Sequence, residues 1–179
     1  MAASDFEIKV VRKHDLSESE RMAVIALCSR VFEEDFVPLL ATFTDATHLF
    51  GVVENNIVSH ALWYARWLQV DDGPLLRTAY VEGVATAEAF RRRGYASLLM
   101  ERLIAEVTAY DLAALSPSRA AFYARLGWEI WHGPLFIRTE TGLRPTPDYE
   151  ELMIHRLPRT PALDTTDRLS AEWREGDLW

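Results

Sequence analysis

The chain has 179 residues and a mass of 20.5 kDa, enough for one domain with a full core, so we expect a single domain over residues 1–179. Its formal net charge of −8 at pH 7 favours a cationic ligand and argues against nucleic acid, because the phosphate backbone is bound mainly by clustered Lys and Arg. The start MAASDFEIKV lacks a basic stretch before an apolar core, and no run of about 18 apolar residues occurs, so we expect a cytoplasmic protein with no membrane partner.

The first half of the chain predicts a strand, a helix and an antiparallel meander. Residues 6–11 alternate like a strand, and residues 17–32 place apolar side chains at helical spacing. Ser17, with Glu20 three residues later, has the pattern of a capping box. The one cysteine, Cys28, lies in this helix and is interpreted as a small buried hydrophobe that forms no disulfide within the chain. The meander strands are expected at residues 47–53, 57–70 and 75–85.

The second half predicts one long helix, over residues 96–109, followed by shorter elements. These are a strand at 112–115, a short helix at 118–125 ended by Gly127, and strands at 128–131 and 151–157. The order of elements predicts an α/β fold of the α+β kind, with a mixed, mostly antiparallel sheet flanked by helices. The five histidines show no metal-ligand spacing, so we expect them to be structural or exposed, and we expect no metal.

The sequence RRRGYA at residues 91–96 lies between the apolar end of a predicted strand and the long helix. The first N–H groups of a helix lack intrahelical acceptors and form the positive end of its dipole, so they bind phosphate. Gly94 and Ala96 leave room for a pyrophosphate against the main chain, and the arginines add permanent positive charge. The alternative is an ordinary basic helix start with a packing glycine. A P-loop and a Rossmann fingerprint are excluded, because neither G-K-[ST] nor the three-glycine pattern is present.

The pattern R-x-x-G-x-A resembles the acetyl-CoA signature of the GCN5-related N-acetyltransferase (GNAT) superfamily, and the order of elements matches across most of the chain. The resemblance implies acetyl-CoA as co-substrate and a sheet that splays at strands 4 and 5, with Gly83 at a bulge. It also implies that main-chain groups hold the pantetheine and the thioester, while the loop holds the pyrophosphate. The implied cofactor-binding residues are Val84, Ala85, Thr86, Arg91, Arg92, Arg93, Gly94, Tyr95, Ala96 and Tyr123.

Acetyl transfer to an amine needs a base for the ammonium proton and an acid for the departing thiolate. Glu82 is the candidate base, because a carboxylate in an apolar strand is costly unless it has a partner or faces a wet cleft. The alternative is a solvent-facing strand residue. Tyr123 is the candidate acid, since SRAAFYARLGW resembles the GNAT motif whose tyrosine faces the thiol sulfur; the alternative is a core tyrosine. We expect Cys28 to lie far from these motifs, and we therefore expect direct attack rather than an acetyl-cysteine route.

Five further segments, YVEGVA, ALS, WHGP, TPD and the final WREGDLW, resemble the aminoglycoside 2'-N-acetyltransferases. That resemblance implies a cationic small-molecule substrate, an aminoglycoside, whose amine proton Glu82 takes through water. It places Ser116 and Tyr123 at the acid end, and the carboxylate of Trp179 at the substrate. The implied substrate-binding residues are Asp35, Glu82, Gly83, Ser116, Asp148, Tyr149, Asp177 and Trp179.

The chain departs from that family at two positions. Leu40 and Tyr149 stand where the mycobacterial-type enzymes have aspartates, so two anionic contacts are missing. Each desolvated ammonium needs a counter-charge, and fewer carboxylates therefore suggest an aminoglycoside with fewer amines, for which kasugamycin is the candidate. Two rivals stay open: a GNAT enzyme for another small amine or a protein N-terminus, and a CoA-binding module without turnover. The oligomeric state is also open, with a homodimer as one alternative.

Overall fold

The computed structural model describes residues 6–147, 150–176 and 178–179. By its internal contacts the chain divides into two compact units. Unit 1 comprises Met1–Tyr64 and Val81–Leu103, and unit 2 comprises Ala65–Tyr80 and Ile104–Trp179. Two long strands, β3 (Asn56–Val70) and β4 (Leu75–Thr86), run from one unit into the other, so each unit contains half of the hairpin that they form.

The strands of unit 1 pair antiparallel in the order β1 (Glu7–Arg12), β2 (Thr47–Val53) and β3. The register of β2 and β3 shifts once, because Gly51 is opposite Ser59 whereas Val52 is opposite Ile57. Val58 is the extra residue of this β-bulge, and it packs with Val53 and Tyr95. The shift reverses the side-chain alternation, so His60 and Val58 lie on opposite faces of β3.

Helix α1 (Glu18–Phe32) begins as its sequence predicts. The Ser17 hydroxyl accepts a hydrogen bond from the Glu20 amide, and the Glu20 carboxylate accepts one from the Ser17 amide, so the predicted capping box is confirmed. The helix ends at Glu33, whose backbone is left-handed. A second helix, α2 (Phe36–Thr42), follows, and its first turn contains Pro38, where a missing N–H costs no hydrogen bond. Helix α2 was not predicted, because it is only two turns long.

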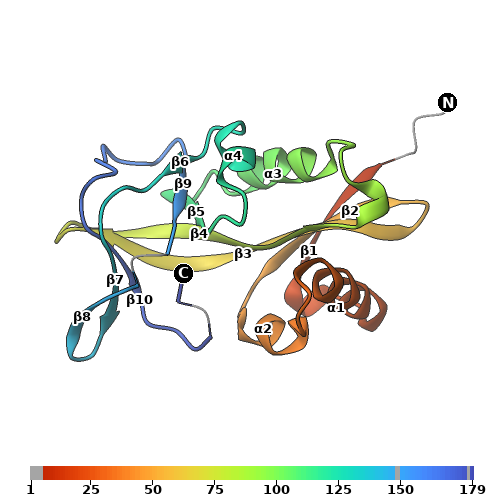
Figure 1. Ribbon diagram of the computed structural model, residues 1–179, viewed down its shortest axis with the longest axis horizontal. Coiled ribbons are helices and arrows are strands. Elements are labelled where there is room, and N and C mark those ends of the chain that lie inside the picture. Colours follow the sequence, from red (N-terminus) through yellow and green to blue (C-terminus); the bar gives the residue numbers. More distant parts are fainter. Residues whose placement is uncertain (1–5, 148–149, 177) are drawn as a thin grey trace. The chain divides into compact units, whose positions relative to one another are not determined.

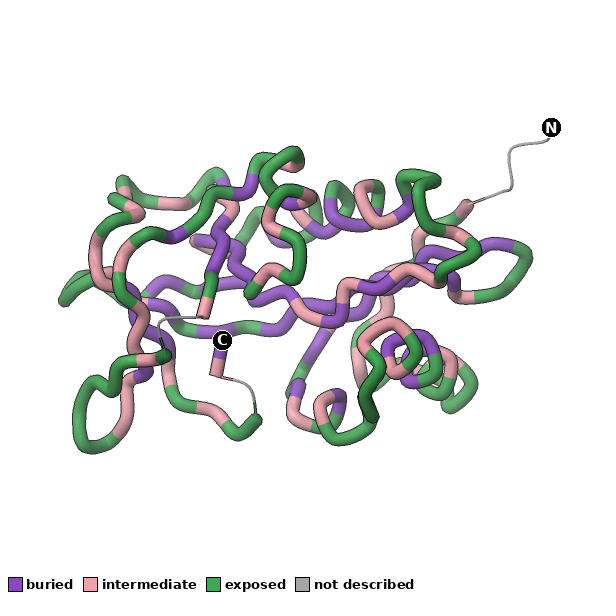
Figure 2. The backbone as a smooth tube through the Cα atoms, in the orientation of Figure 1, coloured by how far each residue is buried: buried purple, intermediate pink, exposed green. Residues whose placement is uncertain are grey.

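The helices of unit 1 cover both faces of its strands, with α1 and α2 on one face and α3 (Tyr95–Glu106) on the other (Figure 1). On the α3 face, the rings of Phe6 and Tyr95 stack 4.0 Å apart above Gly51, where a Cβ atom would come within 2.5 Å of Phe6. On the opposite face lie the side chains of His48 and His60. The strands between the helices are almost continuously buried (Figure 2). Two short 3₁₀ helices, η1 (Lys13–Asp15) and η2 (Glu88–Phe90), complete the unit.

The strands of unit 2 follow the order β6-β9-β5-β4-β3-β10-β7-β8. The pairs β4–β5 and β10–β7 are parallel, whereas β3–β10, β5–β9, β6–β9 and β7–β8 are antiparallel, so the predicted mixed, mostly antiparallel sheet flanked by helices is confirmed. Pairing of β4 with β5 ends at Tyr80 although β4 continues to Thr86, as expected for a sheet that splays at strands 4 and 5. The remaining elements are β5 (Leu112–Leu115), α4 (Ala120–Ala124), β6 (Glu129–Ile130), β7 (Leu135–Thr139), β8 (Gly142–Pro145), β9 (Met153–Arg156) and β10 (Leu169–Glu172).

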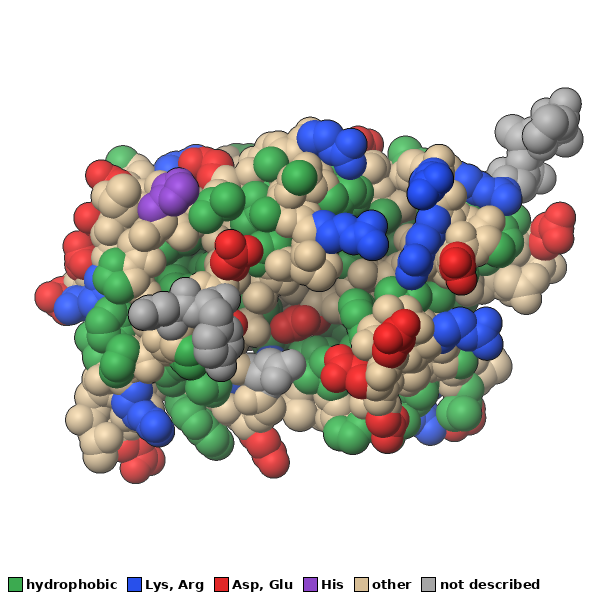
Figure 3. Space-filling model, in the orientation of Figure 1, with side chains coloured by type: hydrophobic (Ala, Val, Ile, Leu, Met, Phe, Trp, Pro, Cys, Tyr) green, Lys and Arg blue, Asp and Glu red, His purple; other side chains and the backbone are tan. Residues whose placement is uncertain are grey.

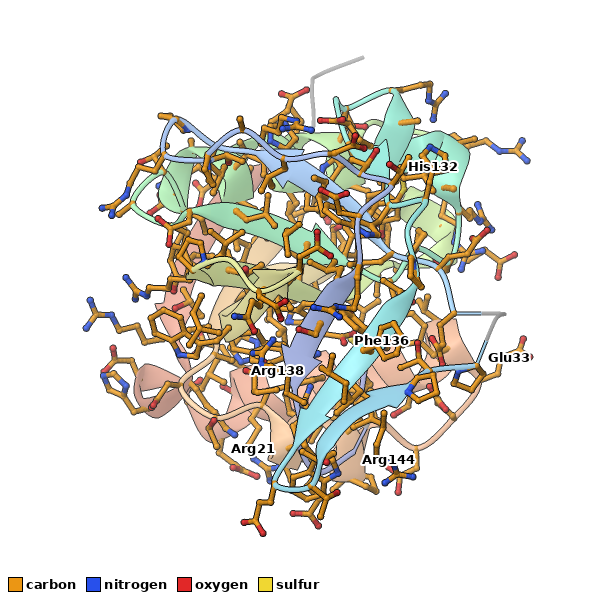
Figure 4. The ribbon with its side chains drawn as sticks, turned by 90° about the vertical axis from the view of Figure 1, so that its left-hand side faces the viewer. Arg21, Glu33, His132, Phe136, Arg138 and Arg144 are labelled. Carbon is orange, nitrogen blue, oxygen red and sulfur yellow. The ribbon has the colours of Figure 1, made fainter. Side chains whose placement is uncertain are left out.

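Two arginines attach β10 and the chain that follows it. Arg138 on β7 reaches across β10, where its guanidinium donates to the Ser170 carbonyl at 2.7 Å (Figure 4). Arg66 is fully buried and donates to the carbonyls of Glu172 and Leu178. No helix in the described ranges is both long and apolar enough to cross a membrane.

Candidate active site

The second half of β4 contains the residues expected to face the reacting groups. Glu82 is partly buried between the buried Val81 and Gly83. Gly83 has a φ of +61°, a left-handed backbone within a strand, which agrees with its predicted place at a bulge. A Cβ atom at Gly83 would lie 3.1 Å from the His60 ring and 3.3 Å from the Phe36 ring, so only glycine fits here without displacement.

Beyond Gly83, the end of β4 is fixed to β3. The Ser59 hydroxyl donates to the Ala85 carbonyl at 3.2 Å and lies 2.8 Å from the Thr86 hydroxyl. The Ala87 amide donates to the carbonyl of the bulge residue Val58 at 2.9 Å. These bonds hold the stretch whose main-chain groups were predicted to bind pantetheine, Val84 to Thr86.

The loop from β4 to α3 has the geometry of an anion site at a helix start. Gly94 has a φ of +82°, and its carbonyl accepts the first intrahelical bond from Leu98. Among the described residues, no heavy atom apart from those of its chain neighbours lies within 4 Å of where its Cβ would be. The first turn of α3 therefore begins beside open space. The three preceding arginines are exposed, and basic side chains gather over this part of the molecule (Figure 3).

The candidate cofactor residues of this loop differ in what their side chains contact. Arg91 donates to the Thr86 carbonyl at 3.3 Å, and Arg93 donates to the Ala89 carbonyl at 3.1 Å, so both brace their own loop. Arg92 has a left-handed backbone with a φ of +62°. The Tyr95 ring is buried against Phe6, so this tyrosine can offer a phosphate its amide but not its ring.

Two buried histidines that we interpreted only as structural or exposed meet the strand at Gly83. His60 Nδ1 lies 2.7 Å from the Gly83 carbonyl oxygen, and His60 Nε2 lies 2.9 Å from His48 Nδ1. Burial lowers the pKa of His60 to about 3, with nearby His48 adding to the shift, and burial lowers the pKa of His48 to about 4. Both rings are therefore neutral at physiological pH. The sequence signal was a histidine in each of two apolar strands, but it does not reveal that the rings meet.

Cys28 lies closer to the candidate site than its sequence position suggested. We expected it far from the motifs, but its Sγ lies 4.0 Å from the Gly83 carbonyl oxygen and 3.6 Å from His60 Nδ1, so that expectation was wrong. Helix α1 packs on the face of β3 and β4 that bears these groups. Burial raises the pKa of the Cys28 thiol to about 12, which keeps it protonated and a poor nucleophile.

One further substrate-site candidate of unit 1, Asp35, lies at the start of α2, and Leu40, where the resemblance implies an aspartate, lies within that helix. Asp35 is exposed and its carboxylate caps the helix by accepting from the Val37 amide at 3.0 Å. Leu40 is buried in the core, so its position presents no group to a substrate. The α2 helix thus offers one carboxylate where the resemblance implied two.

Unit 2 contains the candidate acids. Tyr123 is 5% exposed on α4, with its ring 6.1 Å from that of Trp128, which in turn contacts His155 at 5.5 Å. Ser116 is exposed and directly follows β5.

The tail of unit 2 is anchored by its last indole. Trp179 is 6% exposed, and its ring lies 5.8 Å from the Arg66 guanidinium, which also lies 4.9 Å above the Tyr80 ring. The other predicted substrate residues, Asp148, Tyr149 and Asp177, lie outside the described residues. Across the described ranges, no three or more His, Cys, Asp or Glu side chains are gathered as they would be around a metal ion.

Comparison with known proteins identifies the family. A family model described as an acetyltransferase (GNAT) domain matches residues 12–131. An aminoglycoside 2'-N-acetyltransferase of Mycolicibacterium fortuitum is 32% identical over 180 residues, which cover 96% of this chain and 91% of that protein. The Escherichia coli GNAT family N-acetyltransferase YhbS, solved in complex with CoA, matches with a TM-score of 0.67 and 19% identity over 98% of this chain and 93% of its own. Eis1 of Mycobacterium abscessus matches with a TM-score of 0.60 and 21% identity over 72% of this chain, which spans 32% of the Eis1 chain.

The fold is that of the GNAT acetyltransferases, and the predicted resemblance is confirmed. Within this superfamily, the chain belongs to the family of the aminoglycoside 2'-N-acetyltransferases.

Proposed function

We propose that the protein transfers the acetyl group of acetyl-CoA to the 2'-amine of an aminoglycoside. The observation that carries the proposal is the 32% identity to the Mycolicibacterium fortuitum enzyme, which extends over 96% of this chain and 91% of that protein. The acidic balance of the chain, −8 at pH 7, supports a polycationic substrate.

Acetyl-CoA is proposed to lie along the end of β4 and the start of α3. The open space above Gly94 admits a pyrophosphate to the first turn of α3, and the exposed arginines neutralise its charge. The main chain of Val84, Ala85 and Thr86 is proposed to hold the pantetheine and the thioester. This arrangement needs no metal, because amides and guanidinium groups compensate the negative charge.

The chemistry is direct attack in a ternary complex. Glu82 takes a proton from the substrate ammonium through water, and the neutral amine nitrogen attacks the thioester carbonyl carbon. A carbon–nitrogen bond forms, the carbon–sulfur bond breaks, and the departing thiolate accepts a proton from Tyr123, assisted by Ser116.

We further propose that the substrate has few amines, with kasugamycin as the candidate, and that acetylation confers resistance to it. The proposal is supported by Leu40, which is buried and uncharged where the resemblance implies an aspartate. A site with fewer carboxylates leaves additional ammonium groups uncompensated, and it therefore discriminates against substrates that have more of them.

The direct test measures thiol release from acetyl-CoA across a panel of aminoglycosides, simple amines and peptide N-termini. Nuclear magnetic resonance of the product then assigns the acetylated nitrogen. Turnover of an aminoglycoside with acetylation at the 2'-amine supports the proposal. Turnover confined to peptides or alkyl amines refutes it, and so does CoA binding without any turnover.

Two variants test the assigned roles. We expect Glu82→Gln and Tyr123→Phe each to lower kcat by on the order of 10² with little change in acetyl-CoA affinity. Matched controls make the same replacements away from the site, at Glu101 on the exposed face of α3 and at Tyr110, which stacks under Arg77 at 4.3 Å. Wild-type kcat in both site variants would leave substrate positioning as the source of catalysis.

A further inference from the structure

The Gly83 carbonyl of β4 is held by a side chain. Its oxygen accepts a hydrogen bond from His60 Nδ1 at 2.7 Å. His60 and its neighbour His48 are both fully buried in the core of unit 1. The peptide that follows Gly83 is planar, so the direction of its carbonyl also sets the direction of the Val84 N–H at the other end of the same plane. The contact from His60 therefore fixes a main-chain donor of the stretch proposed to hold the thioester.

The hydrogen-bond geometry assigns every proton in this chain of groups. A carbonyl oxygen can only accept, so His60 donates from Nδ1. A neutral imidazole has one N–H, hence His60 Nε2 must accept, and the donor at 2.9 Å is His48 Nδ1. The direction of donation therefore runs from His48 through His60 to the Gly83 oxygen. No other placement of the two ring protons satisfies both hydrogen bonds while the rings stay neutral.

The surroundings keep both rings neutral. Neither ring has access to water, and the ammonium of Lys13, fixed by the carbonyls of Phe43 and Leu40, adds repulsion against a charge on His48. A neutral, uniquely oriented pair does not fluctuate between protonation states. Successive hydrogen bonds in such a chain also polarise each other, which strengthens the Val84 N–H as a donor.

We infer that His60, oriented by His48, is a positioning residue for acetyl transfer that aims and polarises the Gly83–Val84 peptide toward the thioester carbonyl. The inference rests on the proposed role of the Val84 to Thr86 main chain. Neither histidine touches a substrate. Packing alone does not account for the pair, because apolar rings would fill the same buried positions without the cost of burying four imidazole nitrogens.

The first experiment tests the relay in the intact protein by ¹⁵N magnetic resonance of labelled histidines at pH 7. We expect both buried imidazoles in the Nδ1–H form, and a shift of the Val84 amide resonance when His60 is replaced. An Nε2–H form of His60, or a charged ring, overturns the inference regardless of the substrate.

The second experiment separates hydrogen bonding from packing. His60→Phe retains a ring without a donor, whereas His60→Asn places an amide N–H near the former Nδ1. We expect His60→Phe to lower kcat at least tenfold with acetyl-CoA Kd unchanged within about twofold, and His60→Asn to recover most of that loss. His155→Phe is the matched control, because it removes a hydrogen bond of 2.9 Å between His155 Nδ1 and the Arg156 carbonyl oxygen. We expect this control to leave kcat unchanged. Equal kcat in His60→Phe and wild type overturns the inference.

Failure of the proposed function is distinguishable from failure of this inference. If no aminoglycoside in the panel is acetylated, the substrate assignment fails, and the kcat comparison uses the best amine found in that panel. If no amine reacts, slow enzyme-dependent hydrolysis of acetyl-CoA and the Val84 resonance still report on activation of the thioester carbonyl. A positioning role predicts that His60→Phe reduces this hydrolysis, and an unchanged rate and resonance contradict it.

Discussion

Acidification from pH 7 to pH 5 should destabilise this protein through two histidines. Burial lowers the pKa of His48 to about 4 and that of His60 to about 3, against an ordinary value of 6.5 in the unfolded chain. Above pH 6.5 both histidines are neutral in the folded protein and in the unfolded chain, so they do not lower the free energy of unfolding. Below it the unfolded chain binds protons that the folded protein excludes, so stability falls as the pH falls. pH 5 is about 1.5 units below the pKa of a histidine in the unfolded chain. Each histidine therefore lowers the free energy of unfolding at pH 5 by ~2 kcal/mol, and the pair lowers it by ~4 kcal/mol.

Urea unfolding at pH 7, 6 and 5 measures this loss as a shift in the midpoint at constant slope. Carboxylates whose pKa is lowered in the folded protein, such as that of Glu20, which accepts from Ser17, lose their contribution only below about pH 4.5, outside the window. In a His48→Phe/His60→Phe variant the dependence between pH 7 and pH 5 should nearly vanish. Equal pH dependence in this variant and the wild type would refute the reasoning, as would a flat profile in the wild type.

Three further predictions test the loop of unit 1 and the packing of unit 2. Gly94→Glu should weaken acetyl-CoA binding at least tenfold in calorimetry, about 1.4 kcal/mol, whereas Gly142→Glu, at an open glycine of positive φ on the β7–β8 hairpin, should not; equal Kd values would remove the phosphate site from this loop. Gly133→Ala should lower the unfolding free energy by about 2–3 kcal/mol, because its Cβ would lie 1.8 Å from a facing main-chain oxygen, and a wild-type urea midpoint would contradict that geometry. Arg66→Met should cost ~3 kcal/mol in the same assay, since it leaves two main-chain carbonyls without their buried donor and removes the guanidinium that lies 3.6 Å from the Glu172 carboxylate, and a neutral result would show that the tail is held by apolar contacts alone.

The elements that the sequence predicted are those with a local cause. The capping box at Ser17 starts α1 at the expected residue, and the long strands β3 and β4 end within one residue of their predicted bounds at the Asp71 to Pro74 turn. Helix α3 begins one residue before its prediction, after Gly94. Each of these signals lies within a few residues of the feature that it determines.

The elements that the sequence did not predict depend on distant partners. Strand β10 lies between β3 and β7, and its four residues are held by pairing with both rather than by any pattern of their own. Strands β7 and β8 form a hairpin whose second strand is entirely exposed, so no apolar alternation marked it. Arg66 shares the buried face of β3 with Leu68, a position where a sequence pattern favours an apolar side chain.

For the candidate site, the amino-acid sequence alone determined the residue types and the motif order: the arginines and Gly94 before a helix, Glu82 and Gly83 in one strand, and Tyr123 in a short helix. Each of these motifs lies within a few residues of sequence, and each contains the residue types that phosphate binding, proton transfer or thioester binding requires. Only the tertiary structure decided that His48, His60 and the Gly83 carbonyl form one chain of hydrogen bonds, across sequence separations of 12 and 23 residues. The tautomer, charge and direction of a buried imidazole depend on which groups surround it in space, and the folded core supplies those groups from strands β2, β3 and β4.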